Sequence, residues 1–356
     1  MQQVCRIIVL VLACAASSDA RAQTAEPAKQ EFFDEVGRRV LVPEPVKRIV
    51  SLAPNLTETV YALGAQDRLV GVTDYCDYPP EALAKPKVGG AVNPSLEQIV
   101  AMKPDLVLAT RSLNRRETVE ALERLGIAVY ATDPHSVEGV LDSTRRVAEV
   151  LGVAERAEVL IASLRTRLDD LKQRLAAVPP RRVLFVVWHE PLISIGRETF
   201  VADALRRAGA ESVVDTAQDW PKLNLEEVMR LQPEYLVFAS SHSETVRRTA
   251  DELRTRPGWR AMRAVQQGRF AVVSDAVNRP SPRLVSAIEE LAKQLHPEAF
   301  STKSENRKSK NEIRRSNTPN HILRQPSSVF RFSNFEFRRA QGTQTRAMQS
   351  VPEASR

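Results

Sequence analysis

Six side chains in predicted loops have the chemistry of a ligand-binding site. They are aromatic, imidazole, carboxylate and guanidinium groups, and they follow runs with the composition of buried β-strands. Aromatic rings offer a large, rigid contact area with a polar edge, which suits a bulky, flat ligand. Ligands of open parallel sheets bind beyond the carboxyl ends of the strands, so these positions predict one shared site. The candidates are Tyr75, Trp188, His189, Trp220, Asp275 and Arg279.

Each candidate also has a structural interpretation that the sequence leaves open. The three aromatic candidates could pack in turns or in the core, as we expect for Trp259. Asp275 and Arg279 could pair with each other, or they could bond to amide groups on the rim of a ligand. His189 could ligate a metal centre, although a lone histidine is more often packed or hydrogen-bonded. We predict no metal site that belongs to the protein itself.

The chain carries none of the motifs of several common enzyme classes. It has no G-x-S-x-G elbow, no P-loop and no G-x-G-x-x-G motif. The segment "HEPLI" begins like a metalloprotease helix, but it contains a proline and lacks the second histidine. We therefore predict no catalytic residues and keep an exported enzyme as the least favoured alternative.

One stretch of sequence occurs twice. "SLEQIVAMKPDLVLAT" aligns without a gap with "NLEEVMRLQPEYLVFA", from Ser95 and Asn224 onward. In each copy an N-cap residue opens an amphipathic helix, a proline ends it, and a buried strand follows. Glu97 and Glu226 occupy equivalent first-turn positions, where a carboxylate favours the helix dipole. Two such exposed anions could also dock a partner that carries arginine clusters.

Similar strand and helix patterns surround both copies. Residues 45–152 and 181–300 each read as an α/β lobe, and residues 153–180 separate them without an internal glycine or proline before Pro179. Leucines recur there at every third or fourth residue, which predicts a helix of about 24 residues. In the first lobe, "APNLTETV" predicts a helix capped at Asn55, with Glu58 as the reciprocal partner. We expect an α/β fold with two Rossmann-like lobes of parallel sheet joined by one long, rigid helix.

Both ends of the chain are predicted to lie outside this core. Residues 1–22 combine the apolar run "IIVLVLACAA" with an A-x-A cleavage pattern, so we predict a signal peptide and a periplasmic location. A cut before Cys14 would instead give a lipid-anchored protein. Residues 23–44 form an N-terminal extension, and residues 301–356 are a basic segment that we expect to be disordered.

The net charge of +7 comes mainly from that C-terminal segment, so it does not indicate nucleic-acid binding. Once the signal peptide is removed, Cys76 is the one cysteine left, which excludes an internal disulfide. We expect a monomer that is stabilised by burial of its core.

Four segments carry a resemblance to a known family. "RIVSLAPNLTETVYALG", "VGVTDYCDYPPEA", "SLEQIVAMKPDLVLA" and "SDAVNRPSPRLV" resemble the substrate-binding proteins of ABC importers for vitamin B12, haem and siderophores. The resemblance covers Arg48 to Leu295 and implies a class III periplasmic binding protein without catalysis.

The resemblance also implies roles for individual residues. Tyr75, Trp220, Asp275 and Arg279 match positions that line the ligand cleft, and Glu97 and Glu226 match glutamates that engage arginines of the membrane subunits. The chain departs from the pattern of the cobalamin-binding members at three places: an aromatic residue expected near Ala91 is missing, Thr110 stands where a tryptophan can occur, and the Trp188-His189 pair differs.

We expect a corrinoid, cobalamin, as the transported ligand, delivered to a permease dimer, and no cofactor of the protein's own. The alternative is haem or a ferric siderophore in the same role. Haem would need an axial ligand, which Tyr75 or His189 could supply. A siderophore would need several cations, for which the sequence offers Arg111, Arg115, Arg116 and Arg279.

Overall fold

The computed structural model describes residues 28–239 and 251–301. The predicted signal peptide with Cys14, the start of the predicted extension and nearly all of the predicted C-terminal segment lie outside the described residues. Among the helices described, each is too short or too polar to cross a lipid bilayer.

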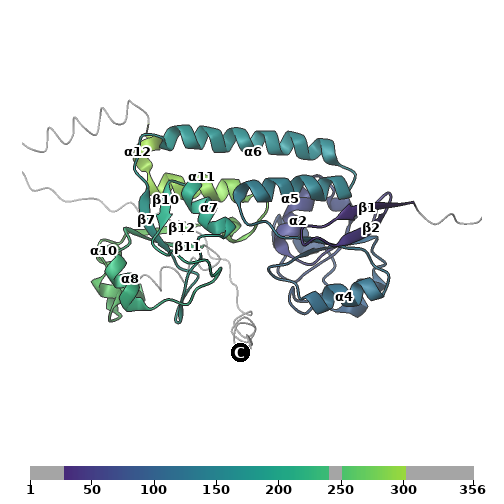
Figure 1. The fold of residues 1–356 in the computed structure, drawn as a ribbon, viewed down its shortest axis with the longest axis horizontal. Helices are drawn as coiled ribbons and strands as arrows, with labels where there is room; N and C mark the ends of the chain where they lie inside the picture. The colour runs from purple at the N-terminus through teal and green to yellow at the C-terminus, as the bar shows by residue number, and fades with distance from the viewer. Residues whose placement is uncertain (1–27, 240–250, 302–356) are drawn as a thin grey trace, which may run out of the picture. The chain divides into compact units, whose positions relative to one another are not determined.

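The first lobe, drawn in purple to blue in Figure 1, contains a parallel sheet. Its four described strands have the order β4-β3-β5-β6. Helices connect the strands, as right-handed parallel crossovers require. The strands are β3 (Ile49–Ser51), β4 (Leu69–Val72), β5 (Leu106–Thr110) and β6 (Val129–Thr132). The helices are α2 (Pro54–Ala62), α3 (Leu96–Ala101), α4 (Arg116–Arg124) and α5 (Val137–Val150), with 3-10 turns η1 (Gln66–Arg68) and η2 (Pro80–Ala84).

The second lobe repeats this topology, with its described strands in the order β10-β7-β11-β12. In both lobes the first strand lies between the second and the third. The strands are β7 (Arg181–Phe185), β10 (Ala210–Ser212), β11 (Tyr235–Ala239) and β12 (Phe270–Val273). The helices are α7 (Phe200–Arg207), α8 (Leu225–Leu231), α10 (Arg263–Gln266), α11 (Leu284–Leu295) and α12 (Pro297–Phe300), with turns η4 (Trp259–Ala261) and η5 (Asp275–Asn278).

The two copies of the repeat fold alike down to their backbone angles. Ser95 caps α3 by accepting a hydrogen bond from the Gln98 amide at 3.3 Å, and Asn224 caps α8 by accepting one from Glu226 at 2.8 Å. Before the proline of each copy stands a non-glycine residue in the left-handed region, with φ of 46° in one copy and 45° in the other. The predicted caps are therefore confirmed.

The start of α2 differs from the sequence-based prediction. The helix begins at Pro54, and Ala53 is its N-cap. Proline suits the first helical position because the amide it lacks would have no partner inside the helix. Asn55 is therefore buried inside the first turn, and Glu58 bonds to the second lobe rather than to a cap. The predicted cap at Asn55 is wrong.

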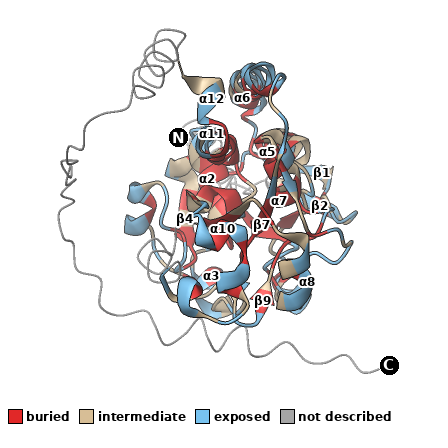
Figure 2. Cartoon of the chain, turned by 90° about the vertical axis from the view of Figure 1, so that its left-hand side faces the viewer, coloured by how far each residue is buried: buried red, intermediate tan, exposed pale blue. Residues whose placement is uncertain are grey.

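Helix α6 (Ala154–Leu175) joins the lobes, and at 22 residues it ends before the half-buried Val178. Its buried residues recur every three or four positions, so one side of the helix packs inward and the other faces water (Figure 2). That side contacts α5 of the first lobe and α11 of the second. One apolar cluster therefore includes residues of the first lobe, of α6 and of the second lobe, from Val40 to Leu295, beside a smaller cluster within each lobe. This arrangement confirms the predicted fold class.

An antiparallel hairpin precedes the first lobe and was not predicted. It consists of β1 (Lys29–Phe33) and β2 (Arg39–Pro43). Val40 and Val42 point into the core, whereas Arg39 and Leu41 point outward. This alternation is the usual signal of a half-buried strand, so the sequence "RVLV" already contained it.

We expect Leu164→Ala in α6 to lower the free energy of unfolding by about 2–4 kcal/mol, because the change leaves a cavity in the packed side of the helix. Urea unfolding followed by circular dichroism measures this loss. The matched control is Val159→Ala on the exposed side of α6, which should change stability by less than about 0.5 kcal/mol. If the two variants lost the same free energy of unfolding, the packed side of α6 would not be holding the lobes together.

Candidate ligand-binding site

The six predicted ligand-binding residues all lie on loops that follow strands at the carboxyl edges of the two sheets. Tyr75 follows β4, and Trp188 and His189 form β8 just after β7. Trp220 lies on the connection after β10. Asp275 opens η5 directly after β12, and Arg279 is the C-cap of that turn. This is the edge at which ligands of parallel sheets bind.

The three candidate aromatic side chains are open to solvent. Tyr75 is 43%, Trp188 40% and Trp220 47% exposed, whereas Trp259 is buried among the apolar residues of the second lobe. Packing in the core is therefore excluded for the first three and confirmed for Trp259. Large exposed aromatic surfaces are typical of sites that a ligand covers.

Two of these aromatics lie on neighbouring segments of the second lobe. Trp188 and His189 pair with β9 (Leu192–Ile193), and their rings lie 5.8 Å apart between centroids. The segment after Trp220 runs beside β9, where the Leu223 amide donates to the Leu192 carbonyl at 2.8 Å. The fold thus brings the loops of Trp188 and Trp220 together.

His189 is set up as a neutral imidazole. Burial lowers its pKa, and the positive charge of Arg256 lowers it further. Arg256 forms an ion pair with Glu190, the residue after His189. A neutral imidazole is the form that ligates metals, so the interpretation of His189 as an axial ligand stays open.

Asn114 fixes the carboxyl edge of the first sheet. It is buried, and its side-chain amide donates to the Leu52 carbonyl at 3.0 Å and to the Ala91 carbonyl at 2.8 Å. Its Oδ1 accepts from the Thr110 amide at 2.7 Å. One side chain therefore ties together three segments that border the site. Ala91 and Thr110, the two departures from the cobalamin-binding pattern, are both buried.

The sequence did not predict the role of Glu58, which connects the lobes next to this site. Its Oε2 accepts from Ser281 Oγ at 2.7 Å and from Arg283 Nε at 3.0 Å. Its Oε1 accepts from Arg283 Nη2 at 2.6 Å and from Arg279 Nη1 at 2.8 Å. The loop that carries Arg279 is therefore held by the first lobe. A signal was available, because Glu58 is the one charged residue of "PNLTETVYA".

Most of the cations that could have met a siderophore are already paired. Arg111 bonds to Asp133 at 2.8 Å, and Arg116 bonds to Glu120 at 2.7 Å. Arg279 bonds to Glu58, as described above. A guanidinium group that is paired with a carboxylate attracts an anionic ligand less strongly than an unpaired one. The attraction for a siderophore is therefore weaker than the number of arginines in the sequence suggested.

Glu97 and Glu226 are exposed in the first turns of α3 and α8. They keep the equivalent positions that the repeat predicted, one on each lobe. Their role in docking stays a prediction.

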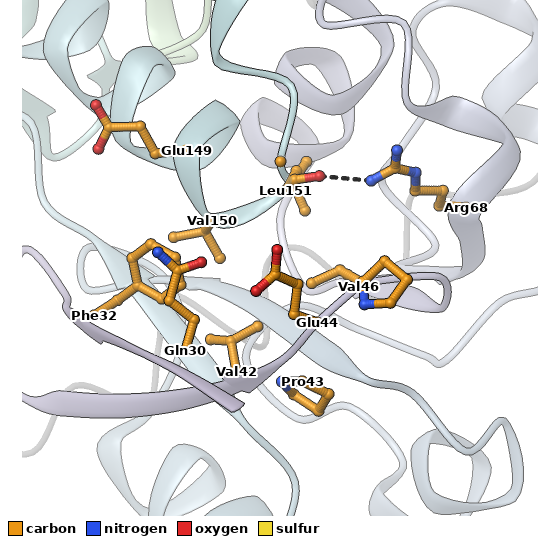
Figure 3. A pocket seen from close by; sticks show the side chains of 12 residues that line it. Gln30, Phe32, Val42, Pro43, Glu44, Val46, Arg68, Glu149, Val150 and Leu151 are labelled. Atoms are coloured by element: carbon orange, nitrogen blue, oxygen red, sulfur yellow. Dashed lines mark hydrogen bonds between the residues drawn. The ribbon is translucent and has the colours of Figure 1, made fainter. Parts of the chain in front are cut away.

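A separate pocket lies between the β1–β2 hairpin and the end of α5 (Figure 3). Phe32, Val42 and Val150 line it, and Arg68 borders it while donating to the Leu151 carbonyl at 2.6 Å. Its volume of about 160 Å³ is below the roughly 300 Å³ of the smaller ligand sites. A tetrapyrrole does not fit there.

Known proteins resemble the chain in sequence and in fold. A vitamin B12-binding protein of Vibrio cholerae is 29% identical over 259 residues, which cover 71% of this chain and 90% of that protein. The uncharacterized ABC transporter substrate-binding lipoprotein YvrC of Bacillus subtilis is 30% identical over 305 residues, which cover 82% of this chain and 95% of that protein.

The solved structures that resemble this chain include binding proteins for two kinds of ligand. The periplasmic vitamin B12-binding protein BtuF of Vibrio cholerae has a TM-score of 0.62 at 26% identity, covering 72% of this chain and 99% of that chain. The periplasmic haem-binding protein RhuT of Roseiflexus sp. RS-1, in its apo form, has a TM-score of 0.64 at 27% identity, covering 71% of this chain and 99% of that chain.

Residues 49–276 match the family described as periplasmic binding protein. The match runs from β3 to η5 and so includes both four-stranded sheets and the helix between them. It confirms the resemblance read from the sequence. The chain therefore belongs to the periplasmic binding protein family, whose members here are substrate-binding transport proteins and not enzymes.

Proposed function

We propose that this substrate-binding protein of an ABC importer binds a corrinoid, cobalamin, between its two lobes and delivers it to a permease dimer in the membrane. The protein would act in the periplasm, either free after cleavage of residues 1–22 or anchored through Cys14. The observation that carries the proposal is the set of exposed aromatic side chains at the carboxyl edges of both sheets.

Tyr75 comes from the first lobe, and Trp188 and Trp220 come from the second. A ligand that touches all three must be large, because it has to reach loops of two separate sheets. Flat rings on such loops suit the face of a macrocycle. The similarity to vitamin B12-binding proteins over about seven-tenths of the chain supports the same choice.

Haem is the second candidate, and His189 is the observation that favours it. Its imidazole is half-buried, held neutral and adjacent to Trp188. A neutral imidazole can serve as an axial ligand to haem iron. The similarity to a haem-binding protein is compatible with this alternative.

Purified protein mixed with cyanocobalamin, hemin or a ferric siderophore should retain cyanocobalamin in a one-to-one ratio. Gel filtration followed by absorption spectroscopy measures the retained amount. A Soret shift with hemin that His189→Ala abolishes would favour the haem alternative. Retention of the siderophore alone would contradict both candidates.

We expect Trp220→Ala to weaken cyanocobalamin binding by about tenfold to a hundredfold, because it removes a large rigid contact from the ligand. Isothermal titration calorimetry measures the change. Leu125→Ala, at an exposed apolar residue at the end of α4, is the control and should leave the affinity unchanged. If Trp220→Ala binds as tightly as the unaltered protein, Trp220 does not contact the ligand.

The docking proposal rests on the repeat. Glu97 and Glu226 present one exposed carboxylate on each lobe, at the same place in the same structural unit. Two matching subunits of a permease could meet both sites at once. Charges at the rim of an interface affect the rate and the orientation of association with the partner. They should therefore affect docking to the permease more than ligand binding.

The double variant Glu97→Ala with Glu226→Ala should bind ligand normally and lose most uptake in vesicles that contain the cognate importer. Its ligand affinity is measured separately by calorimetry. Gln98→Ala with Glu227→Ala changes the neighbouring exposed pair and is the matched control, for which transport should persist. Normal uptake by the first double variant would remove the docking role.

A further inference from the structure

Arg279, a predicted ligand-binding cation, is already paired with two carboxylates. Its Nη1 donates to Glu58 Oε1 at 2.8 Å and to Asp77 Oδ1 at 2.7 Å. The Glu58 side chain is 2% exposed, whereas the Asp77 side chain is 55% exposed. Arg279 therefore lies between a buried anion on α2 and an anion that faces solvent.

The four charges at this place balance. Arg283 also bonds to Glu58 and lies over the Tyr78 ring, 3.8 Å from its centroid. Glu58 is thus shared by two guanidinium groups, and Asp77 supplies the second negative charge. We call Glu58, Asp77, Arg279 and Arg283 the four-charge cluster. Without Asp77 the cluster would carry a net positive charge.

Asp77 keeps its charge at neutral pH. Burial by itself would raise its pKa, but the hydrogen bond and the positive charge of Arg279 outweigh burial and hold the pKa below its usual value. Burial likewise acts to lower the pKa of Arg279, yet the bonds from Asp77 and Glu58 raise it. Both partners therefore stay ionised across the physiological range.

The position of Asp77 places it beside the proposed ligand. It lies two residues after Tyr75 on the loop that follows β4, and it reaches across to Arg279 on the loop that follows β12. The cluster consequently lies at two of the loops that carry predicted ligand-binding residues, those of Tyr75 and Arg279.

A balanced cluster treats neutral and anionic ligands differently. Both carboxylates use one nitrogen of a guanidinium group, which carries five N–H donors, so Arg279 can still bond to a ligand oxygen. A neutral amide oxygen accepts such a bond without changing the charge balance. A ligand carboxylate would add an uncompensated negative charge at a partly buried site, where charges interact more strongly than in water.

We propose that Asp77, together with Glu58, makes the site select a tetrapyrrole with uncharged amide substituents over one with carboxylate substituents. The inference rests on the proposed function and assigns its specificity to this cluster. Both acids act through Arg279, so they are positioning and specificity-determining residues. Discrimination works here by making the wrong ligand unfavourable.

The test measures dissociation constants for cyanocobalamin, whose side chains include amides, and for hemin, which carries two propionates. Quenching of tryptophan fluorescence reports both. Asp77→Asn should shift the ratio of the two constants toward hemin by about threefold to fivefold, the range for a solvent-accessible charge. The shift should shrink at high salt. Asp77→Glu, which keeps the charge, should restore the original ratio.

Asp74→Asn is the matched control, because it removes an exposed carboxylate from the same loop and should leave the ratio unchanged. An unaltered ratio in Asp77→Asn, an equal shift in Asp74→Asn, or no restoration by Asp77→Glu would overturn the inference while cyanocobalamin binding by the unaltered protein still supports the proposed function. Unaltered protein that retains neither compound rejects the proposed function, and the inference falls with it.

Discussion

One apolar core that passes from the first sheet through α6 into the second constrains the rest of the structure. The helix has a packed side that contacts both lobes, so the largest buried cluster is shared between them, beside a smaller cluster within each lobe. A wide opening would bring this shared surface into water at a cost of about 25 cal/mol for each square ångström exposed. The shared core therefore opposes a wide opening of the lobes.

The second connection between the lobes is electrostatic. Burying the Glu58 carboxylate is unfavourable unless donors surround it, and here Ser281, Arg279 and Arg283 do so. The three donors belong to one short segment between η5 and α11. The ion cluster thus fixes the segment that borders the proposed site, while the core fixes the lobes. The same buried charge that orders this loop also neutralises the cation expected to meet the ligand.

Such a protein needs no reactive group. The described loops at the sheet edges offer aromatic faces, an imidazole whose pKa is lowered and cations that are paired with carboxylates. Under the proposed function, ligand specificity depends on which charged side chains are paired and on which aromatic rings are exposed. The two repeated units place a matching glutamate at the same position of each lobe.

Local rules read from the sequence were sufficient for the repeat, its caps, the joining helix and the α/β class, because caps and periodicity depend on residues a few positions apart. They failed at α2, where proline moved the helix start, and they overlooked the hairpin despite the alternation in "RVLV". The sequence identified Trp188 and Trp220 as candidate binding residues, but it did not show that their side chains are exposed. Only the tertiary structure decided that exposure and the partners of Arg279, because a charge pair between residues 221 positions apart depends on how the finished lobes meet and leaves no local pattern in the chain.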